Sequence, residues 1–252
     1  MANLFDRGEY EKAEAGARAL AAAPRRFWDR GPVLEWLTGG LATAAAIAQG
    51  RGAEVQAELD TLIADLERTT GAGRALLLEV RVNRVAALLD QGRYTEAEAE
   101  ADGILRAALR IAHLTQVHDI ELSALANLAT ALNRQGRYEE AEAIARGNLP
   151  RAQAGLVTTL HCSLVSSLNG QGRYEEALAE ARHLTPTWDC TESGTLDIGV
   201  ATALHGLGRR SEAEATARRA LSACEEFLHP AHPRIEEART LLHRITAEGP
   251  PA

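Results

Sequence analysis

The stretch QGRYEEA occurs twice without change in this chain, at Gln135–Ala141 and again at Gln171–Ala177. A third copy, QGRYTEA at Gln91–Ala97, differs by one residue. Weaker versions of the motif surround three further glycines, Gly8, Gly50 and Gly208. A glycine in this context therefore recurs at intervals of 36 to 44 residues. Recurrence at such a spacing indicates an array of structural repeats.

The residues around each glycine predict two helices joined by a tight turn. Around Gly136, apolar Leu132 lies four residues before it, and Ala141 and Ala145 lie five and nine residues after it. The two alanines share a helical face because they are one turn apart. Glycine ends a helix at little cost in the left-handed conformation. Tyr138 is expected to start the second helix, and in the last repeat Ser211–Glu214 is expected to form a capping box.

This repeat resembles the tetratricopeptide repeat family, whose GxYxxA turn is written here as GRYTEA and GRYEEA. The stretches at Ala126–Arg146 and His229–Pro233, ANLATALNRQGRYEEAEAIAR and HPAHP, are similar to its kinesin-light-chain-like bacterial subclass. The longer repeat of that subclass matches the 42-residue spacing of the first three glycines. Arg84 departs from the pattern, because the family usually has Leu there. The resemblance implies an all-α fold, a right-handed superhelical solenoid of antiparallel helix pairs whose first helices line a concave groove.

On this interpretation residues 1–252 form a single solenoid. It comprises a truncated first unit at residues 1–30, five helix pairs at 31–228 and a C-terminal capping helix at 232–248. The last helix is apolar on one face and charged on the other, as a terminal cap requires. The short first unit leaves an uncapped N-terminal end with apolar surface. Either the chain is part of a longer protein, or a partner or a second copy of the chain covers that end. The last of these alternatives predicts a homodimer.

The composition excludes several classes of partner. The net charge is −8, the isoelectric point is about 5.5, and Lys12 is the only lysine, so nucleic acid is not an expected partner. The longest apolar run, Leu41–Ala48, is too short to span a membrane. The N-terminal residues do not form the apolar segment of a signal peptide. Three widely spaced cysteines are typical of reduced thiols. These features predict a cytoplasmic protein without membrane partners or cofactors.

The repeat phase also predicts which residues face the groove. In the last three helix pairs they are mostly short, neutral and able to form hydrogen bonds. In the first two pairs they are mainly apolar: Leu37, Gly40, Ala44 and Ile47, then Glu79, Val82, Ala86 and Leu89. Hydroxyl and amide groups can bind the backbone of an extended peptide. The alternative is that these hydroxyls bond to carbonyls of their own helix. The candidate peptide-binding residues are Ser123, Thr130, Asn133, Thr159, Cys162, Ser166, Asn169, Thr202 and His205.

Two further asparagines, Asn83 and Asn127, lie nine residues before their glycines. They match an asparagine of the subclass signature NLA, which resembles a clamp for a peptide backbone, and Asn127 keeps the full signature. Of the two, we place Asn127 among the candidate peptide-binding residues. The alternative is a polar residue on the helix surface.

Catalytic and metal sites are not expected. The chain has no GxGxxG, P-loop or GxSxG motif. Adjacent His161 and Cys162 point about 100° apart on a helix and do not suit a shared metal. The sequence therefore predicts a non-catalytic scaffold that binds a protein or an extended peptide. One alternative is the sensor or effector part of a bacterial regulator, and a weaker one is an enzyme that uses Cys162 and His205 as a nucleophile pair.

Overall fold

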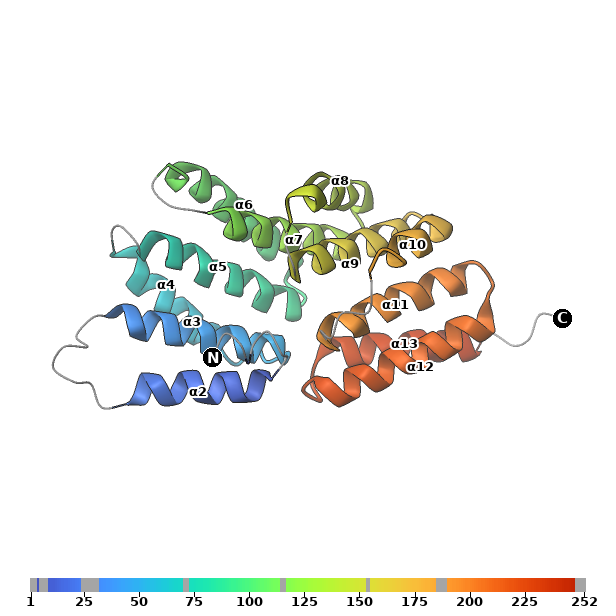
Figure 1. Cartoon of the computed structure of the whole chain (residues 1–252), viewed down its shortest axis with the longest axis horizontal. Coiled ribbons are helices and arrows are strands. Elements are labelled where there is room, and N and C mark those ends of the chain that lie inside the picture. Colours follow the sequence, from blue (N-terminus) through green and yellow to red (C-terminus); the bar gives the residue numbers. More distant parts are fainter. Residues whose placement is uncertain are drawn as a thin grey trace. The chain divides into compact units, whose positions relative to one another are not determined.

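In the computed structural model the described residues form α-helices, with one short 3-10 turn at Leu149–Arg151 (Figure 1). The structure describes residues 4, 9–23, 32–69, 73–113, 117–152, 155–184 and 190–247. The chain divides into two compact units, residues 1–128 and 129–252.

The first unit contains α2 (Tyr10–Ala22), α3 (Pro32–Ala48), α4 (Gln56–Glu67), α5 (Gly73–Asp90) and α6 (Tyr94–Ile111). The helix α7 (His118–Arg134) passes from the first unit into the second. The second unit continues with α8 (Tyr138–Asn148), α9 (Gly155–Gly170), α10 (Tyr174–Ala181), α11 (Cys190–Gly206), α12 (Arg210–Phe227) and α13 (Pro233–Ala247). Of the predicted first unit at residues 1–30, residues 1–3, 5–8 and 24–30 lie outside the described residues, as does residue 248 of the predicted capping helix.

The glycine turns have the predicted conformation. Five glycines have φ between 72° and 82°, the left-handed region that other residues rarely adopt: Gly50, Gly92, Gly136, Gly172 and Gly208. Gly8 lies outside the described residues. The tyrosine two residues after the glycine is the first residue of α2, α6, α8 and α10, as predicted. The alanines five and nine residues after the glycine are buried in all of these helices.

An arginine directly after the glycine stabilises the start of the second helix. Arg137 lies at the N-cap of α8 and forms a bidentate ion pair with Glu140, with distances of 2.7 and 2.6 Å. Arg209 pairs with Glu212 in the same way at the start of α12. The predicted capping box of Ser211 is wrong, because α12 begins at Arg210 and has Arg209 at its N-cap. Ser211 therefore already lies within the first turn.

Three of these tyrosines, Tyr10, Tyr138 and Tyr174, pack against a small residue of the next helix pair. Tyr138 lies against Gly170, where an added Cβ would overlap the ring. Tyr174 lies against Gly206 in the same way. In the first unit, Ala48 packs against the cluster that contains Tyr10. A small residue at this position lets successive pairs approach closely.

Polar groups also join successive pairs. The Glu142 carboxylate accepts hydrogen bonds from Arg146, Gln171 and Arg173, at 2.8, 2.8 and 2.6 Å. Burial opposes ionisation of Glu142, but these hydrogen bonds and the two arginine charges outweigh it and lower the pKa. Glu14 accepts from Gln49 and Arg51 in the first unit. The glutamine that precedes the turn glycine thus forms a hydrogen bond that links two successive helix pairs.

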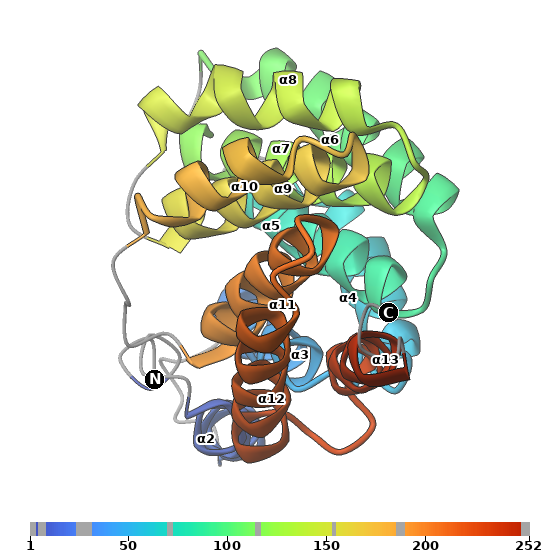
Figure 2. The ribbon, with the colours of Figure 1, turned by 90° about the vertical axis from the view of Figure 1, so that its right-hand side faces the viewer.

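The helix α13 packs alongside α11 and α12 in the second unit (Figures 1 and 2). Its buried face consists of Ile235, Ala238, Leu241 and Ile245. His232 lies at its start, and the backbone N–H of Arg234 donates to His232 Nδ1 at 3.1 Å. The pKa of His232 is lowered to about 3, by burial first and then by the charges of Arg234 and His229.

None of the described helices combines the length and the apolar character that a membrane crossing requires.

Candidate functional site

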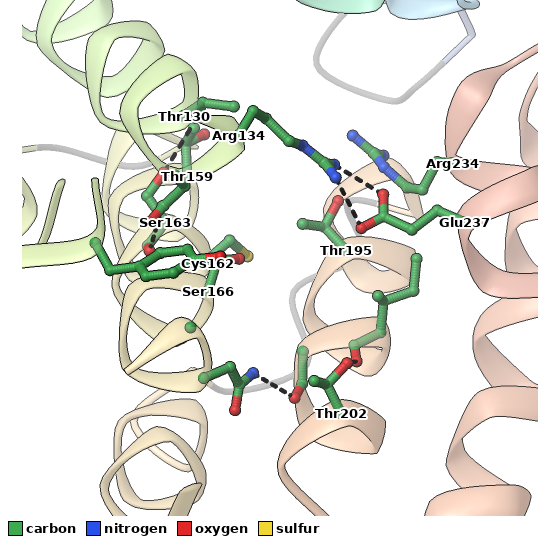
Figure 3. A pocket seen from close by; sticks show the side chains of 16 residues that line it. Thr130, Arg134, Thr159, Cys162, Ser163, Ser166, Thr195, Thr202, Arg234 and Glu237 are labelled. Atoms are coloured by element: carbon green, nitrogen blue, oxygen red, sulfur yellow. Dashed lines mark hydrogen bonds and ion pairs between the residues drawn. The ribbon is translucent and has the colours of Figure 1, made fainter. Parts of the chain in front are cut away.

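A pocket of about 370 Å³ opens in the second unit between the last turns of α7 and helices α9, α11 and α13 (Figure 3). Its volume lies in the range of small-ligand and peptide pockets. Three of the four helices are the first helices of their pairs. The pocket is lined by Thr130, Asn133, Arg134, Tyr138, Thr159, Cys162, Ser163, Ser166, Asn169, Gly170, Thr195, Ile198, Gly199, Thr202, Arg234 and Glu237.

The structure brings most of the candidate residues to this pocket. They are Thr130, Asn133, Thr159, Cys162, Ser166, Asn169 and Thr202. Ser123 and Asn127 belong to the first unit. His205 lies in the last turn of α11 and does not line the pocket. The repeat phase thus groups residues from three helices. The first and last of these residues, Thr130 and Thr202, are 72 positions apart in the sequence.

The floor of the pocket is a hydrogen-bonded joint between α7 and α9. The Asn133 Nδ2 group donates to the Ser163 carbonyl at 2.9 Å. The Ser167 hydroxyl lies 2.8 Å from both Asn133 Oδ1 and the Ser163 carbonyl. The hydroxyls of Thr130 and Ser163 are 3.3 Å apart. The Asn133 amide is therefore engaged within the protein and fixes the position of two helices.

A second asparagine makes the equivalent joint between α9 and α11. Asn169 Nδ2 donates to the Gly199 carbonyl at 2.8 Å. Gly199 is needed for this approach, because a Cβ there would lie 2.8 Å from Val165 Cγ1. The Thr202 hydroxyl donates to the Ile198 carbonyl of its own helix at 2.8 Å, and Thr159 bonds to Gly155 at 3.2 Å. For these two threonines the structure shows the alternative of a bond within the helix.

Three polar atoms of the pocket have no protein partner among the described residues. The Ser166 side chain is exposed, and its hydroxyl can donate and accept. Asn169 Oδ1 and Thr195 Oγ1 are buried and unpartnered. A buried polar group without a partner costs about 1–3 kcal/mol, so these atoms favour a ligand that supplies hydrogen bonds.

The rim of the pocket is charged, which corrects the expectation of a neutral groove. Arg134 forms a bidentate ion pair with Glu237 of α13, at 3.1 and 2.8 Å (Figure 3). Arg234 of α13 also lines the pocket. The repeat phase missed Arg234 and Glu237 because it considered only the first helices of pairs. It missed Arg134 because it did not include the position two residues before the glycine. The spacing of three between Arg234 and Glu237 places both on one face of the last helix, which is the signal that could have found them.

The two groups considered as a nucleophile pair differ in their position relative to the pocket. Cys162 lines the pocket with 5% of its surface exposed, while His205 lies outside the lining. Burial, followed by the charge of His183, lowers the pKa of His161, against the opposing charge of Glu180. In the part of the chain that the structure describes, no three His, Cys, Asp or Glu side chains are grouped to hold a metal ion.

The first unit has a separate groove of about 530 Å³ between α2, α3 and α5. Leu37, Gly40, Ala44 and Glu79, which the repeat phase assigned to an apolar half of the groove, line it. Ile47, assigned there as well, is buried in the core instead. Asn83 Nδ2 donates to the Gly40 carbonyl at 3.1 Å and so joins α3 to α5. Asn127 reaches the Val82 carbonyl in the same manner, at 3.5 Å.

Comparison with protein families finds two family models that are both described as tetratricopeptide repeat. One matches residues 122–155, and the other matches residues 78–102 and 197–219. The matched segments include the turns at Gly92, Gly136 and Gly208. A search of curated proteins finds no match to the chain.

Proposed function

Because the chain is a tetratricopeptide-repeat protein, we propose that it is a non-catalytic scaffold that holds an extended segment of a partner protein in the pocket of the second unit. Proteins built from these repeats generally act by binding other proteins. The proposal for this chain concerns the specific pocket and the kind of segment that enters it.

One observation carries the proposal. Successive first helices, α7, α9 and α11, turn short polar side chains toward the same pocket. Among these, Ser166 is exposed, and Asn169 Oδ1 and Thr195 Oγ1 are buried with no hydrogen-bond partner in the described part of the chain. An extended peptide exposes one N–H and one C=O per residue, and these complement such groups without demanding a particular side chain.

The charged rim adds orientation. Arg134 and Glu237 pair with each other across the mouth of the pocket. A charged peptide side chain that enters there replaces one of these two residues as the ion-pair partner of the other. Exposed pairs of this kind contribute about 0–1 kcal/mol, so the exchange costs little. The polar floor and the charged rim together favour a polar or mixed-charge segment over a purely apolar one.

The test blocks the pocket without disturbing the joints that hold the helices. Ser166→Trp places a large ring in the opening, where the serine makes no hydrogen bond to any residue that the structure describes. Ser222→Trp on α12 is the matched control, because Ser222 is also an exposed helical serine and does not line the pocket. Circular dichroism and the unfolding midpoint establish that both variants fold.

The readout is site-specific photo-crosslinking in cells of the source organism, followed by identification of the crosslinked peptide by mass spectrometry. A crosslinking residue at Thr159 should capture one reproducible partner segment in the wild type and in Ser222→Trp, and lose it in Ser166→Trp. Equal capture in all three proteins would exclude this pocket as the binding site.

A further inference from the structure

The groove of the first unit differs in chemistry from the pocket of the second. Three leucines with large exposed fractions line it, Leu20 at 40%, Leu34 at 44% and Leu37 at 49%. Leu34, Leu37 and Leu41 follow one face of α3, and Leu76 and Val80 follow the facing side of α5. Gly40 has no side chain and lies against Val80, so no side chain from this position fills the groove.

The polar groups of the groove are already engaged, with one exception. The Thr38 hydroxyl donates within α3 to Leu34, at 2.8 Å. The Asn83 amide donates to Gly40. Glu79 is the one charged residue in the lining, and its carboxylate has neither a hydrogen-bond donor nor a cation among the described residues. Two other carboxylates of this unit are each paired with two arginines, Glu14 with Arg18 and Arg51, and Glu100 with Arg81 and Arg84.

The lone carboxylate determines what the groove can accept. Its apolar surroundings raise the pKa of Glu79, because they disfavour the charged form. The Glu79 side chain is exposed in the open groove, so a purely apolar ligand would bury its carboxylate without compensation, which is costly. A ligand that brings a cation next to the carboxylate removes that cost and still fills the apolar lining.

We propose that the groove of the first unit binds an apolar segment of a partner protein that carries one lysine or arginine, with the cation against Glu79 and its apolar neighbours against Leu34 and Leu37. The inference rests on the proposed scaffold function but assigns a second site with its own specificity. Charge complementarity supports this occupant over a second copy of the chain, because the chain carries a net charge of −8.

The test uses short fluorescent peptides of leucine, alanine and serine that differ only at one central residue, which is lysine, its uncharged isostere norleucine, or glutamate. Anisotropy titrations give the affinities. The wild type should bind the lysine peptide about fivefold more tightly than the norleucine peptide, as expected for a partly exposed ion pair. Glu79→Gln should make the two affinities equal. Glu79→Lys should favour the glutamate peptide instead.

Two further variants test the apolar lining. Leu37→Asp should weaken all peptides about tenfold, because the groove loses a buried contact and gains a charge. Leu109→Asp is the matched control, since Leu109 is a leucine of the same unit with 78% of its surface exposed and does not line the groove. It should leave the affinities unchanged.

Equal binding of the lysine and norleucine peptides to the wild type would overturn the proposal, and so would an unchanged preference in Glu79→Gln. Self-association in sedimentation that Leu37→Asp abolishes, with no peptide binding, would assign the groove to a second copy instead. Ser166→Trp lies in the other unit and should not change any of these affinities. Failure at the second-unit pocket is therefore distinguishable from failure here.

Discussion

The two units join their first helices by asparagines that reach in opposite directions along the chain. In the first unit Asn83 and Asn127 lie nine residues before the turn glycine and donate back to the preceding first helix. In the second unit Asn133 and Asn169 lie three residues before the glycine and donate forward to the following first helix. Each of these joints thus has one bridging asparagine, at one position or the other.

This difference accounts for much of the contrast between the pocket of the second unit and the groove of the first. Where the bridging asparagine lies nine residues before its glycine, the residue three before the preceding glycine is apolar. This residue is Ile47 at the joint made by Asn83 and Leu89 at the joint made by Asn127. Where that role passes to Asn133 and Asn169, the position nine before the next glycine becomes small, Ser163 or Gly199. The polar floor of the second-unit pocket is therefore a consequence of how the helices are joined.

The largest expected effect concerns the tyrosine joint, which uses Gly170 in the second unit and Ala48 in the first. Gly170→Ala should destabilise the second unit by about 3 kcal/mol, because the new methyl group overlaps the Tyr138 ring in a packed interface. Urea denaturation monitored by circular dichroism measures the change. Gly147→Ala in α8 is the control, since a Cβ there meets nothing within 4 Å.

The control should be neutral or stabilise the helix by about 0.5–1 kcal/mol, the usual effect of replacing glycine in a helix. A Gly170→Ala protein as stable as Gly147→Ala would show that the tyrosine joint is loosely packed.

The next largest effect is expected in mild acid, which should change the stability of the two units in opposite directions. The reason is that the pKa of His232 is lowered and the pKa of Glu79 is raised. The pKa of His232 is lowered to about 3, so the stability it contributes is present above its unfolded pKa and is lost as the pH falls toward 3. Between pH ~6.5 and ~5 the loss is about 2 kcal/mol, from about 1.4 kcal/mol per pH unit. His161, also lowered by burial, acts in the same direction.

The pKa of Glu79 is raised, so lowering the pH through that value favours the folded first unit. Hydrogen exchange, corrected for the intrinsic pH dependence, should therefore show that α13 loses protection at pH 5 while α3 and α5 do not. His232→Asn keeps an acceptor at the start of α13 and should remove most of the effect. Equal loss of protection in the wild type and in this variant would assign it to other groups.

The smallest expected effect distinguishes the two kinds of asparagine bridge. Asn133→Ala removes a donor to Ser163 and an acceptor for Ser167, and should cost about 2 kcal/mol. Asn83→Ala removes a single bond to Gly40 and should cost about 1 kcal/mol. Both values come from unfolding midpoints by differential scanning calorimetry. The reverse order would mean that the backward bridge is the stronger one.

Much of the fold could be predicted from the sequence, because the repeat fixes where each helix begins. The glycine turns, the tyrosines at the helix starts and the buried alanines all follow from local propensity and periodicity. The phase also identified residues such as Thr130 and Ser166 that share one pocket. It could not reveal that the Asn133 and Asn169 amides are consumed in joints, because hydrogen-bond partners on other helices depend on packing distances. Nor could it place Arg234 and Glu237, which come from a helix outside the repeat.

The joints between helix pairs bear on how such an array changes length. A block that runs from one glycine to the residue before the next contains both Glu142 and Gln171, and both Tyr138 and Gly170. In the following block the tyrosine and its small partner, Tyr174 and Gly206, are again in the same block. Gene duplication or deletion of a whole block therefore keeps the two contacting residues of each such pair together. Recombination at a point between the two residues separates them. A boundary at a glycine therefore keeps the tyrosine and Glu142–Gln171 contacts within one block of 36 residues, while the bonds of Asn133 to Ser163 and of Asn169 to Gly199 cross the boundary and must be made again with the neighbouring block.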